Sequence, residues 1–228
     1  RAYDQIINDL CINNSNALIL VYRASIYGNK DMTHLGFNDI TMLGNMPNLM
    51  YLSPTTVEEL ESAIHYGLEQ HNHPIAIRIP VGIPIHDTNQ SNTTDSPVTS
   101  YGITQSGNTI AIIGVGNFYH KAIELGHAIQ DTMQISPTII KPLCISSLDT
   151  DTLNQLTKDH QIVITLEDGE LEGGYGQKIA SYYGKTSMKV LNYGISKQFY
   201  DRYKPEDVLH QNHLDIAQIL NDIRTIQH

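Results

Sequence analysis

Cysteine is scarce in this chain, and its two copies, Cys11 and Cys144, lie far apart. This spacing excludes a disulfide framework and a Cys-x-x-Cys metal pair. Long apolar runs are also missing, because none approaches the roughly 18–20 residues that a membrane span requires. No segment has the pattern of a signal peptide. We therefore predict a cytoplasmic protein without a membrane partner.

Positive charge is scarce as well. The 228 residues include 14 lysines and arginines against 24 aspartates and glutamates, a formal net charge of −10 with a pI near 5.4. This balance argues against nucleic acid or an anionic membrane surface as the main partner. A protein this acidic that handles an anionic substrate must concentrate a few arginines locally. Hydrophobic residues make up 40% of the chain, which is typical of globular domains.

The first residues lack the usual features of a chain start. Arg1 is not a methionine, and Ala2, Ile6, Ile7 and Leu10 already recur at helical spacing with no capping residue ahead of them. We expect that the sequence begins inside a structural element and is the remnant of a longer chain.

Short apolar runs alternate with amphipathic segments along the rest of the chain. This strand–helix–strand alternation predicts parallel sheets with helical crossovers. A possible capping box, Thr55 and Glu58, marks the start of one helix. The predicted strands are 17–22, 49–52, 75–79, 109–113, 138–140, 162–166 and 188–192, and the predicted helices lie at 2–10, 57–68, 119–132, 150–158, after 176, and over 214–223.

The composition changes between residues 84 and 107, where Asp, Thr, Asn, Ser and Gly replace most apolar residues. Such a stretch is typical of an exposed linker. We therefore predict an α/β protein with two three-layer α/β/α domains and mostly parallel sheets. The predicted domains are residues 1–83 and 108–228, and residues 84–107 join them.

Two glycine-rich segments resemble nucleotide-binding motifs without satisfying them. Gly114 and Gly116 open a helix as in a dinucleotide fingerprint, but Tyr119 occupies the third glycine position. Residues 172–178 look like a phosphate loop, yet the GxxxxGK[ST] pattern is not met. A tight strand-to-helix turn and a closely packed helix start explain these glycines better.

Eleven histidines raise the question of a metal site. Two closely spaced pairs, His71 with His73 and His210 with His213, have no cysteine or carboxylate set at ligand spacing nearby. We predict solvated histidines and no metal site.

The segment 23–36 (RASIYGNKDMTHLG) carries the densest set of functional groups. It directly follows a buried strand and so lies at a strand's carboxyl end, where open α/β sheets place their ligands. Arg78 ends a later strand and could meet Arg23 across neighbouring strand ends. Two convergent guanidiniums suit a phosphate or a carboxylate. The alternative is a surface loop with incidental charges.

Several blocks of the sequence resemble one enzyme family over essentially the whole chain. The blocks RAYDQI (1–6), YRAS (22–25), THLG (33–36), LSP (52–54) and IRIP (77–80) are similar to the pyrimidine-binding domain of the deoxyxylulose-phosphate synthase family, in its order and nearly its spacing. The later blocks TLED (165–168) and EGGYG (172–176) resemble the VEE…GGxG segment of the transketolase C-terminal domain. The resemblance implies a transketolase-like enzyme that uses thiamine diphosphate.

The resemblance also implies residue roles. His34 matches the catalytic histidine that hydrogen-bonds the thiamine-bound intermediate and the substrate oxygen. Arg23 and Arg78 match the arginines that hold the phosphate of the acceptor substrate. Arg1 and Tyr3 match positions beside the pyrimidine pocket of the cofactor.

Four positions depart from the family pattern and leave the acceptor substrate open. Tyr22 stands where the family usually has an acid, and Ser25 replaces a glycine. Lys30 occupies the usual position of the acid before the histidine, and the carboxylate appears instead at Asp31. We expect Asp31 to contribute to substrate binding together with the two arginines.

In this family two further parts lie upstream of the position that matches Arg1. One is a glutamate that activates the cofactor, and the other is a domain that holds Mg²⁺ and the diphosphate through a GDG…N segment. We therefore expect thiamine diphosphate and Mg²⁺ in the full-length enzyme, with neither bound by this chain alone. The expected partners are a second copy of the chain, in a homodimer, and the missing N-terminal diphosphate-binding domain.

The implied activity is a transferase reaction of isoprenoid biosynthesis, in which pyruvate condenses with glyceraldehyde 3-phosphate and loses CO₂. One alternative is another transketolase-like enzyme. A second is the β-subunit of a 2-oxo-acid dehydrogenase, although the glutamate it needs is not on this chain. A third is a non-catalytic remnant that only dimerises or regulates.

Overall fold

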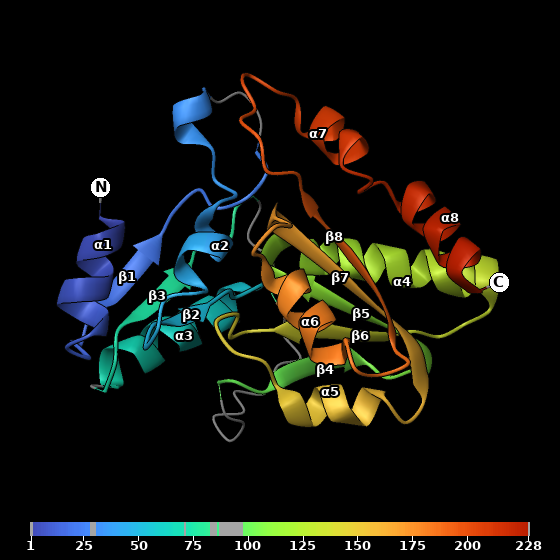
Figure 1. Ribbon diagram of the computed structural model, residues 1–228, viewed down its shortest axis with the longest axis horizontal. Coiled ribbons are helices and arrows are strands. Elements are labelled where there is room, and N and C mark those ends of the chain that lie inside the picture. The colour runs from blue at the N-terminus through green and yellow to red at the C-terminus, as the bar shows by residue number, and fades with distance from the viewer. Residues whose placement is uncertain (1, 28–30, 71, 83–85, 87–97, 228) are drawn as a thin grey trace.

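The computed structural model describes residues 2–27, 31–70, 72–82, 86 and 98–227. Two sheets form two α/β units that lie side by side (Figure 1). The predicted fold class is therefore confirmed. Within the described residues, no helix is both long and apolar enough for a membrane span.

The first unit contains three parallel strands in the order β1-β3-β2. Its central strand β3 is fully buried because it has a neighbour on each side. The unit consists of α1 (Tyr3–Gln5), the π-helix η1 (Ile6–Cys11), β1 (Leu18–Val21), the 3₁₀ turn η2 (Met32–His34), α2 (Asp39–Leu43), β2 (Met50–Leu52), α3 (Val57–Glu69) and β3 (Ile75–Arg78).

Helix α3 begins one residue later than the predicted capping box requires. The N-cap is Thr56, whose hydroxyl accepts a hydrogen bond from the backbone N–H of Glu59 at 3.2 Å. The Glu59 carboxylate reaches back to the backbone N–H and hydroxyl of Thr55, at 2.7 Å each. The prediction of Thr55 and Glu58 was therefore wrong by one position, because two threonines and two glutamates in succession offer the same spacing twice.

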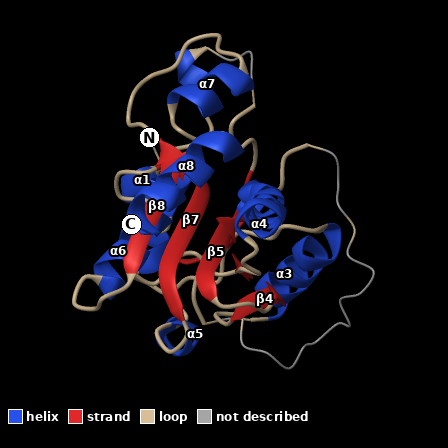
Figure 2. Cartoon of the chain, turned by 90° about the vertical axis from the view of Figure 1, so that its right-hand side faces the viewer, coloured by secondary structure: helices blue, strands red, loops and turns tan. Residues whose placement is uncertain are grey.

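The second unit contains five strands in the order β4-β6-β5-β7-β8, of which β4 alone runs antiparallel. Helices α4 and α8 share one apolar cluster on one face of this sheet, and α5 and α6 share another on the opposite face. Figure 2 shows α4 and α6 on opposite sides of the sheet. The unit consists of β4 (Tyr101–Gln105), β5 (Thr109–Val115), η3 (Gly116–Phe118), α4 (Tyr119–Met133), β6 (Thr138–Pro142), α5 (Thr150–Leu156), β7 (His160–Glu170), α6 (Tyr175–Tyr183), β8 (Lys189–Ile195), α7 (Pro205–Gln211) and α8 (Ile216–Gln227).

Strand β4 lies inside the range predicted as a linker. Residues 84–85 and 87–97 lie outside the described residues, whereas Tyr101–Gln105 pairs with β6 at the edge of the second sheet. Tyr101 is buried and Ile103 is 46% exposed, so this edge strand buries little apolar surface. Because an edge strand needs few apolar residues, its composition resembles that of a loop.

The two units share a buried core. One apolar cluster joins Ile40 and Leu43 of α2 to Val163 of β7 and Tyr175 of α6. The backbones also pair across the boundary: the N–H of Ile145 donates to the Tyr51 carbonyl at 2.8 Å, and the N–H of Ser53 donates to the Leu143 carbonyl at 2.7 Å. A largely buried ion pair, Lys141 Nζ to Glu59 Oε1 at 2.7 Å, adds a further link. The arrangement of the two units is therefore set by packing as well as by chain connectivity.

Candidate functional site

The carboxyl ends of β1, β3 and β2 meet at one edge of the first sheet, and the predicted site residues follow two of these strands. Arg23 comes just after β1 and adopts a positive φ of 61°. Ser25 and Gly36 form an antiparallel bridge. A side chain at Gly36 would place its Cβ 1.8 Å from the Arg23 carbonyl oxygen. Glycine at position 36 therefore lets the two flanks of segment 23–36 approach each other.

His34 lies at the end of the exposed 3₁₀ turn η2. Its backbone N–H donates to the Asp31 carbonyl at 2.8 Å, and its ring Nδ1 lies 2.9 Å from the Thr33 hydroxyl. When that hydroxyl donates to Nδ1, the neutral imidazole carries its proton on Nε2. His34 is then prepared to donate a hydrogen bond from Nε2 to an oxygen of a bound molecule.

Asp31 also lies on the surface, where its partner comes from the second unit. The Asp31 carboxylate lies 3.5 Å from Nε of Arg202, in the connection between β8 and α7. Both side chains are well exposed, at 66% and 75%, so the pair contributes little to stability, about 1 kcal/mol or less. The same exposure leaves both groups accessible to a ligand.

Arg78 does not join Arg23 at the surface. It is 2% exposed, and all three of its guanidinium nitrogens donate to groups on Asp39 and Asp168. Nε donates to Asp39 at 2.7 Å, Nη1 donates to the Asp168 carboxylate, and Nη2 lies 3.3 Å from an oxygen of each residue. Asp39 and Asp168 thus occupy donors of Arg78 that a phosphate clamp would need, while the role of Arg78 toward the acceptor phosphate stays a prediction.

The surroundings of Arg78 satisfy the remaining polar atoms. The Tyr51 hydroxyl donates to Asp39, and Asn117 Nδ2 donates to Asp168 at 2.9 Å. Burial alone would lower the pKa of Arg78, but Asp168 and Asp39 raise it well above its usual value, so the guanidinium stays charged. Gly116 makes this possible, because a Cβ there would lie 2.8 Å from Nη1 of Arg78. The interpretation of Gly116 as part of a tight structural turn is confirmed.

Glu167, next to Asp168, caps helix α6 from inside the protein. Its carboxylate accepts from the backbone N–H groups of Tyr175 and Gly176, at 2.9 Å each. Burial raises the pKa of Glu167 to about 7, against the lowering effect of these two hydrogen bonds. A Cβ on Gly174 would lie 2.5 Å from the same carboxylate. The glycines of segment 172–176 thus serve the closely packed helix start that the sequence predicts.

The predicted cofactor-binding residues lie at the beginning of the chain. Tyr3, in the first turn of α1, is 44% exposed, and Arg1 lies outside the described residues. Among the residues that the structure describes, no group of three or more His, Cys, Asp and Glu side chains could hold a metal ion.

Four functional groups were missed from the sequence because their partners are distant in the chain. Asp39 and Asp168 bind Arg78, and Arg202 and Tyr203 contact the predicted site from the second unit. The one available signal was Asp168, a carboxylate that follows the apolar run 162–166 and that the structure places, buried, inside β7.

The fold is that of an α/β protein whose candidate site lies at strand carboxyl ends. The pyrimidine-binding domain of transketolase matches residues 1–83, and the transketolase C-terminal domain matches residues 101–219. The chain belongs to the transketolase family of transferases.

Its similar proteins include 1-deoxy-D-xylulose-5-phosphate synthases from Clostridium tetani, at 31% identity over 98% of this chain, and from Gloeothece citriformis, at 30% over 98%. The chain spans about 36% and 35% of the lengths of these relatives. A solved split-gene transketolase, described as an inactive β4 tetramer, is similar with a TM-score of 0.80 and 17% identity, over 99% of this chain and 71% of that chain. Transketolase from Campylobacter jejuni gives a TM-score of 0.67 and 16% identity, over 91% of this chain and 31% of that chain. These two structures support the fold alone.

Proposed function

We propose that this chain supplies the pyrimidine-binding and C-terminal domains of a 1-deoxy-D-xylulose-5-phosphate synthase. The proposed reaction is the thiamine-diphosphate-dependent condensation of pyruvate with glyceraldehyde 3-phosphate, with loss of CO₂. The proposal rests on the exposed position of His34 on η2, beyond the carboxyl end of β1. Relatives that match 98% of this chain are named 1-deoxy-D-xylulose-5-phosphate synthases.

Arg23 and His34 are the residues to which we assign the substrate contacts. His34 would donate a hydrogen bond to the reacting oxygen, for which the Thr33 contact at Nδ1 orients its ring. Arg23 would bind the phosphate of the acceptor, with Asp31 at the rim of the site. We leave Arg78 out of the substrate site and assign it to the structural network with Asp39 and Asp168.

The described residues do not fit the whole cofactor. Asp31 pairs with Arg202 and the buried Asp39 and Asp168 bind Arg78, and no cluster suited to Mg²⁺ occurs in the described ranges. We therefore propose that a separate domain or polypeptide contributes the ligands for the diphosphate and Mg²⁺. Calorimetry of this chain with thiamine diphosphate and Mg²⁺ should then show affinity no tighter than millimolar. Micromolar binding of thiamine diphosphate by this chain alone would contradict the proposal that a separate domain supplies these ligands.

We also propose self-association of the chain. The similar split-gene transketolase is named as an inactive β4 tetramer, so a protein of this fold can assemble with itself. Tyr22, Met32 and Phe199 are 67%, 52% and 80% exposed and offer apolar surface for such contacts. Sedimentation at micromolar concentration should give a dimer or larger. A species of about 25 kDa alone would contradict the proposal.

The direct test is to reconstitute turnover. The chain would be combined with a diphosphate-binding domain from a homologous synthase, and CO₂ release from pyruvate would be followed with and without glyceraldehyde 3-phosphate. We expect turnover that requires thiamine diphosphate and both substrates, and that is strongly reduced in His34→Ala. His65→Ala, on the exposed side of α3, is the matched control. Turnover with a ketose phosphate donor instead of pyruvate would favour another transketolase-like enzyme.

A further inference from the structure

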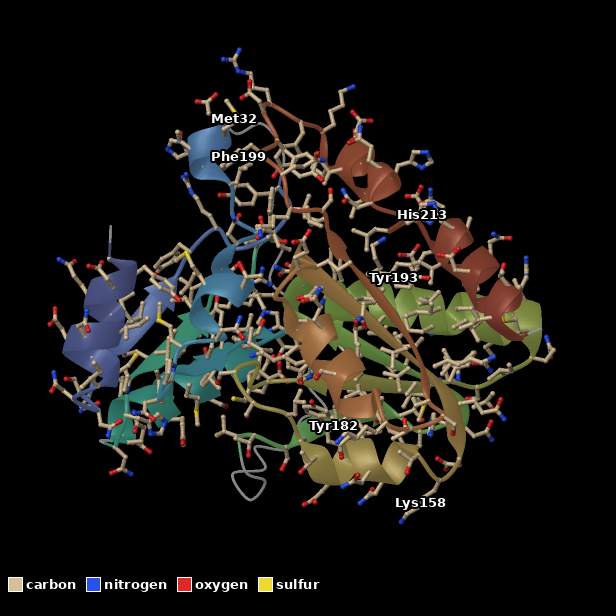
Figure 3. The ribbon with its side chains drawn as sticks, in the orientation of Figure 1. Met32, Lys158, Tyr182, Tyr193, Phe199 and His213 are labelled. Carbon is tan, nitrogen blue, oxygen red and sulfur yellow. The ribbon has the colours of Figure 1, made fainter. Side chains whose placement is uncertain are left out.

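The connection between β8 and α7 reaches from the second unit to both described flanks of the candidate site. The Tyr203 hydroxyl donates to the Tyr27 carbonyl at 3.2 Å, and Arg202 pairs with Asp31. Figure 1 shows this connection near η2, in agreement with the Arg202–Asp31 pair, and Figure 3 labels Met32 on the turn and Phe199 on the connection. The second unit therefore touches the chain on either side of the undescribed residues 28–30.

Aromatic packing reinforces these polar contacts. Phe37 is fully buried, and its ring meets Tyr200 edge-on at 5.5 Å and Tyr203 at 6.4 Å. Tyr200 and Tyr203 also pack against each other at 5.9 Å. Phe37 lies three residues after His34, so this cluster fixes the carboxyl-terminal end of residues 31–38.

Strand β7 holds the same end through hydrogen bonds. The backbone N–H of Glu170 donates to the Phe37 carbonyl at 2.8 Å, and Asn38 Nδ2 donates to the Glu170 carboxylate at 3.0 Å. By contrast, η2 itself is a single 3₁₀ turn of three exposed residues. A segment this short has little stability of its own, so contacts from the second unit must hold it in place.

We propose that Tyr203 is a positioning residue, which holds the His34 turn in its binding geometry from the C-terminal domain. This inference rests on the proposed function insofar as His34 contacts the substrate. Tyr203 suits the role because its ring packs on Phe37, after the turn, while its hydroxyl binds Tyr27, before the turn. One side chain thus joins both flanks, through a ring contact on one side and a part-buried hydrogen bond on the other.

The variant that isolates this contact is Tyr203→Phe, which removes the hydroxyl and retains the ring. Tyr200→Phe is its matched control, because the Tyr200 hydroxyl bonds with Ser196 at 2.6 Å and Asn212 at 3.0 Å, within its own unit. Hydrogen–deuterium exchange would be measured on peptides that cover residues 18–27 and 31–38 of the purified chain. We expect exchange about threefold to tenfold faster there in Tyr203→Phe, the effect of one lost hydrogen bond, and no change in Tyr200→Phe.

The reconstituted enzyme supplies a second measurement. Tyr203→Phe should lower kcat for the condensation severalfold, because a loosened turn holds the His34 donor less well, while the KM for the aldehyde phosphate stays within about twofold. Tyr200→Phe should change neither. Unchanged exchange in Tyr203→Phe, equal acceleration in both variants, or faster exchange with an unchanged kcat would overturn the inference. If the reconstituted wild type shows no turnover with these substrates, the proposed function fails, and the exchange comparison alone decides whether Tyr203 holds the turn.

Discussion

Arg78 and Asp168 face each other across the boundary between the two units, fully buried and directly bound. Asp39 binds the same guanidinium from the start of α2, five residues after His34. One cation therefore ties together the end of β3, the beginning of α2 and the carboxyl end of β7. The pair is a structural link at the point where an exposed phosphate clamp had been expected.

Arg78→Ala should therefore destabilise the chain. It would leave two buried carboxylates without their cation, at a cost of about 3–5 kcal/mol in the free energy of unfolding. Urea unfolding at pH 7 measures this loss. Arg202→Ala is the control, since the exposed pair with Asp31 is worth about 1 kcal/mol or less. Wild-type stability in Arg78→Ala, together with a raised KM for the acceptor, would restore the phosphate-clamp interpretation.

Gly36→Ala tests the close approach of the two flanks of the candidate site. The new Cβ would lie 1.8 Å from the Arg23 carbonyl oxygen, a backbone atom that cannot move without breaking the Ser25–Gly36 bridge. We expect a loss of about 1–3 kcal/mol in the free energy of unfolding and faster amide exchange in residues 31–38. Gly184→Ala, whose Cβ would meet its nearest atom at 3.4 Å, should be nearly neutral. Equal effects of the two substitutions would show that the crowding at Gly36 is relieved without cost.

The sequence predicted the seven parallel strands because each is a short apolar run, and buried parallel strands are apolar on both faces. It missed β4, an edge strand with one partner, and the short helices α2 and α7, whose few turns give little periodicity. Arg23 comes just after β1 and His34 lies on the later turn η2, an order that the sequence gives locally, and their roles stay predictions. The burial of Arg78 and its pairing with Asp168 were not predictable, because Asp168 lies 90 residues away in the chain. Nothing in the local sequence distinguishes a buried arginine from an exposed one.

Glu167 should make stability depend on pH. Burial raises its pKa from an ordinary 4.5 to about 7, so the folded state binds the proton more tightly than the unfolded chain. Its contribution is fully present below about pH 4.5 and is lost as the pH rises through about 7, a change on the order of 3 kcal/mol. The free energy of unfolding, measured at pH 5, 6, 7 and 8, should therefore fall more steeply in wild type than in Glu167→Gln. Parallel curves for the two proteins would show that Glu167 does not titrate in this range.

His34→Ala should separate catalysis from folding. Because His34 is exposed and its ring contacts Thr33 alone among the interactions that the structure describes, its removal should change the free energy of unfolding by less than about 0.5 kcal/mol. In the reconstituted enzyme, loss of a positioned proton donor should lower kcat by about 10²–10⁴-fold. Thr33→Val, which removes the hydroxyl at Nδ1 and leaves the imidazole, should give a smaller decrease in kcat, since the ring loses the contact that orients it. A decrease in kcat that follows a loss of stability in His34→Ala, or an unaffected kcat in a stable variant, would exclude His34 from the reaction.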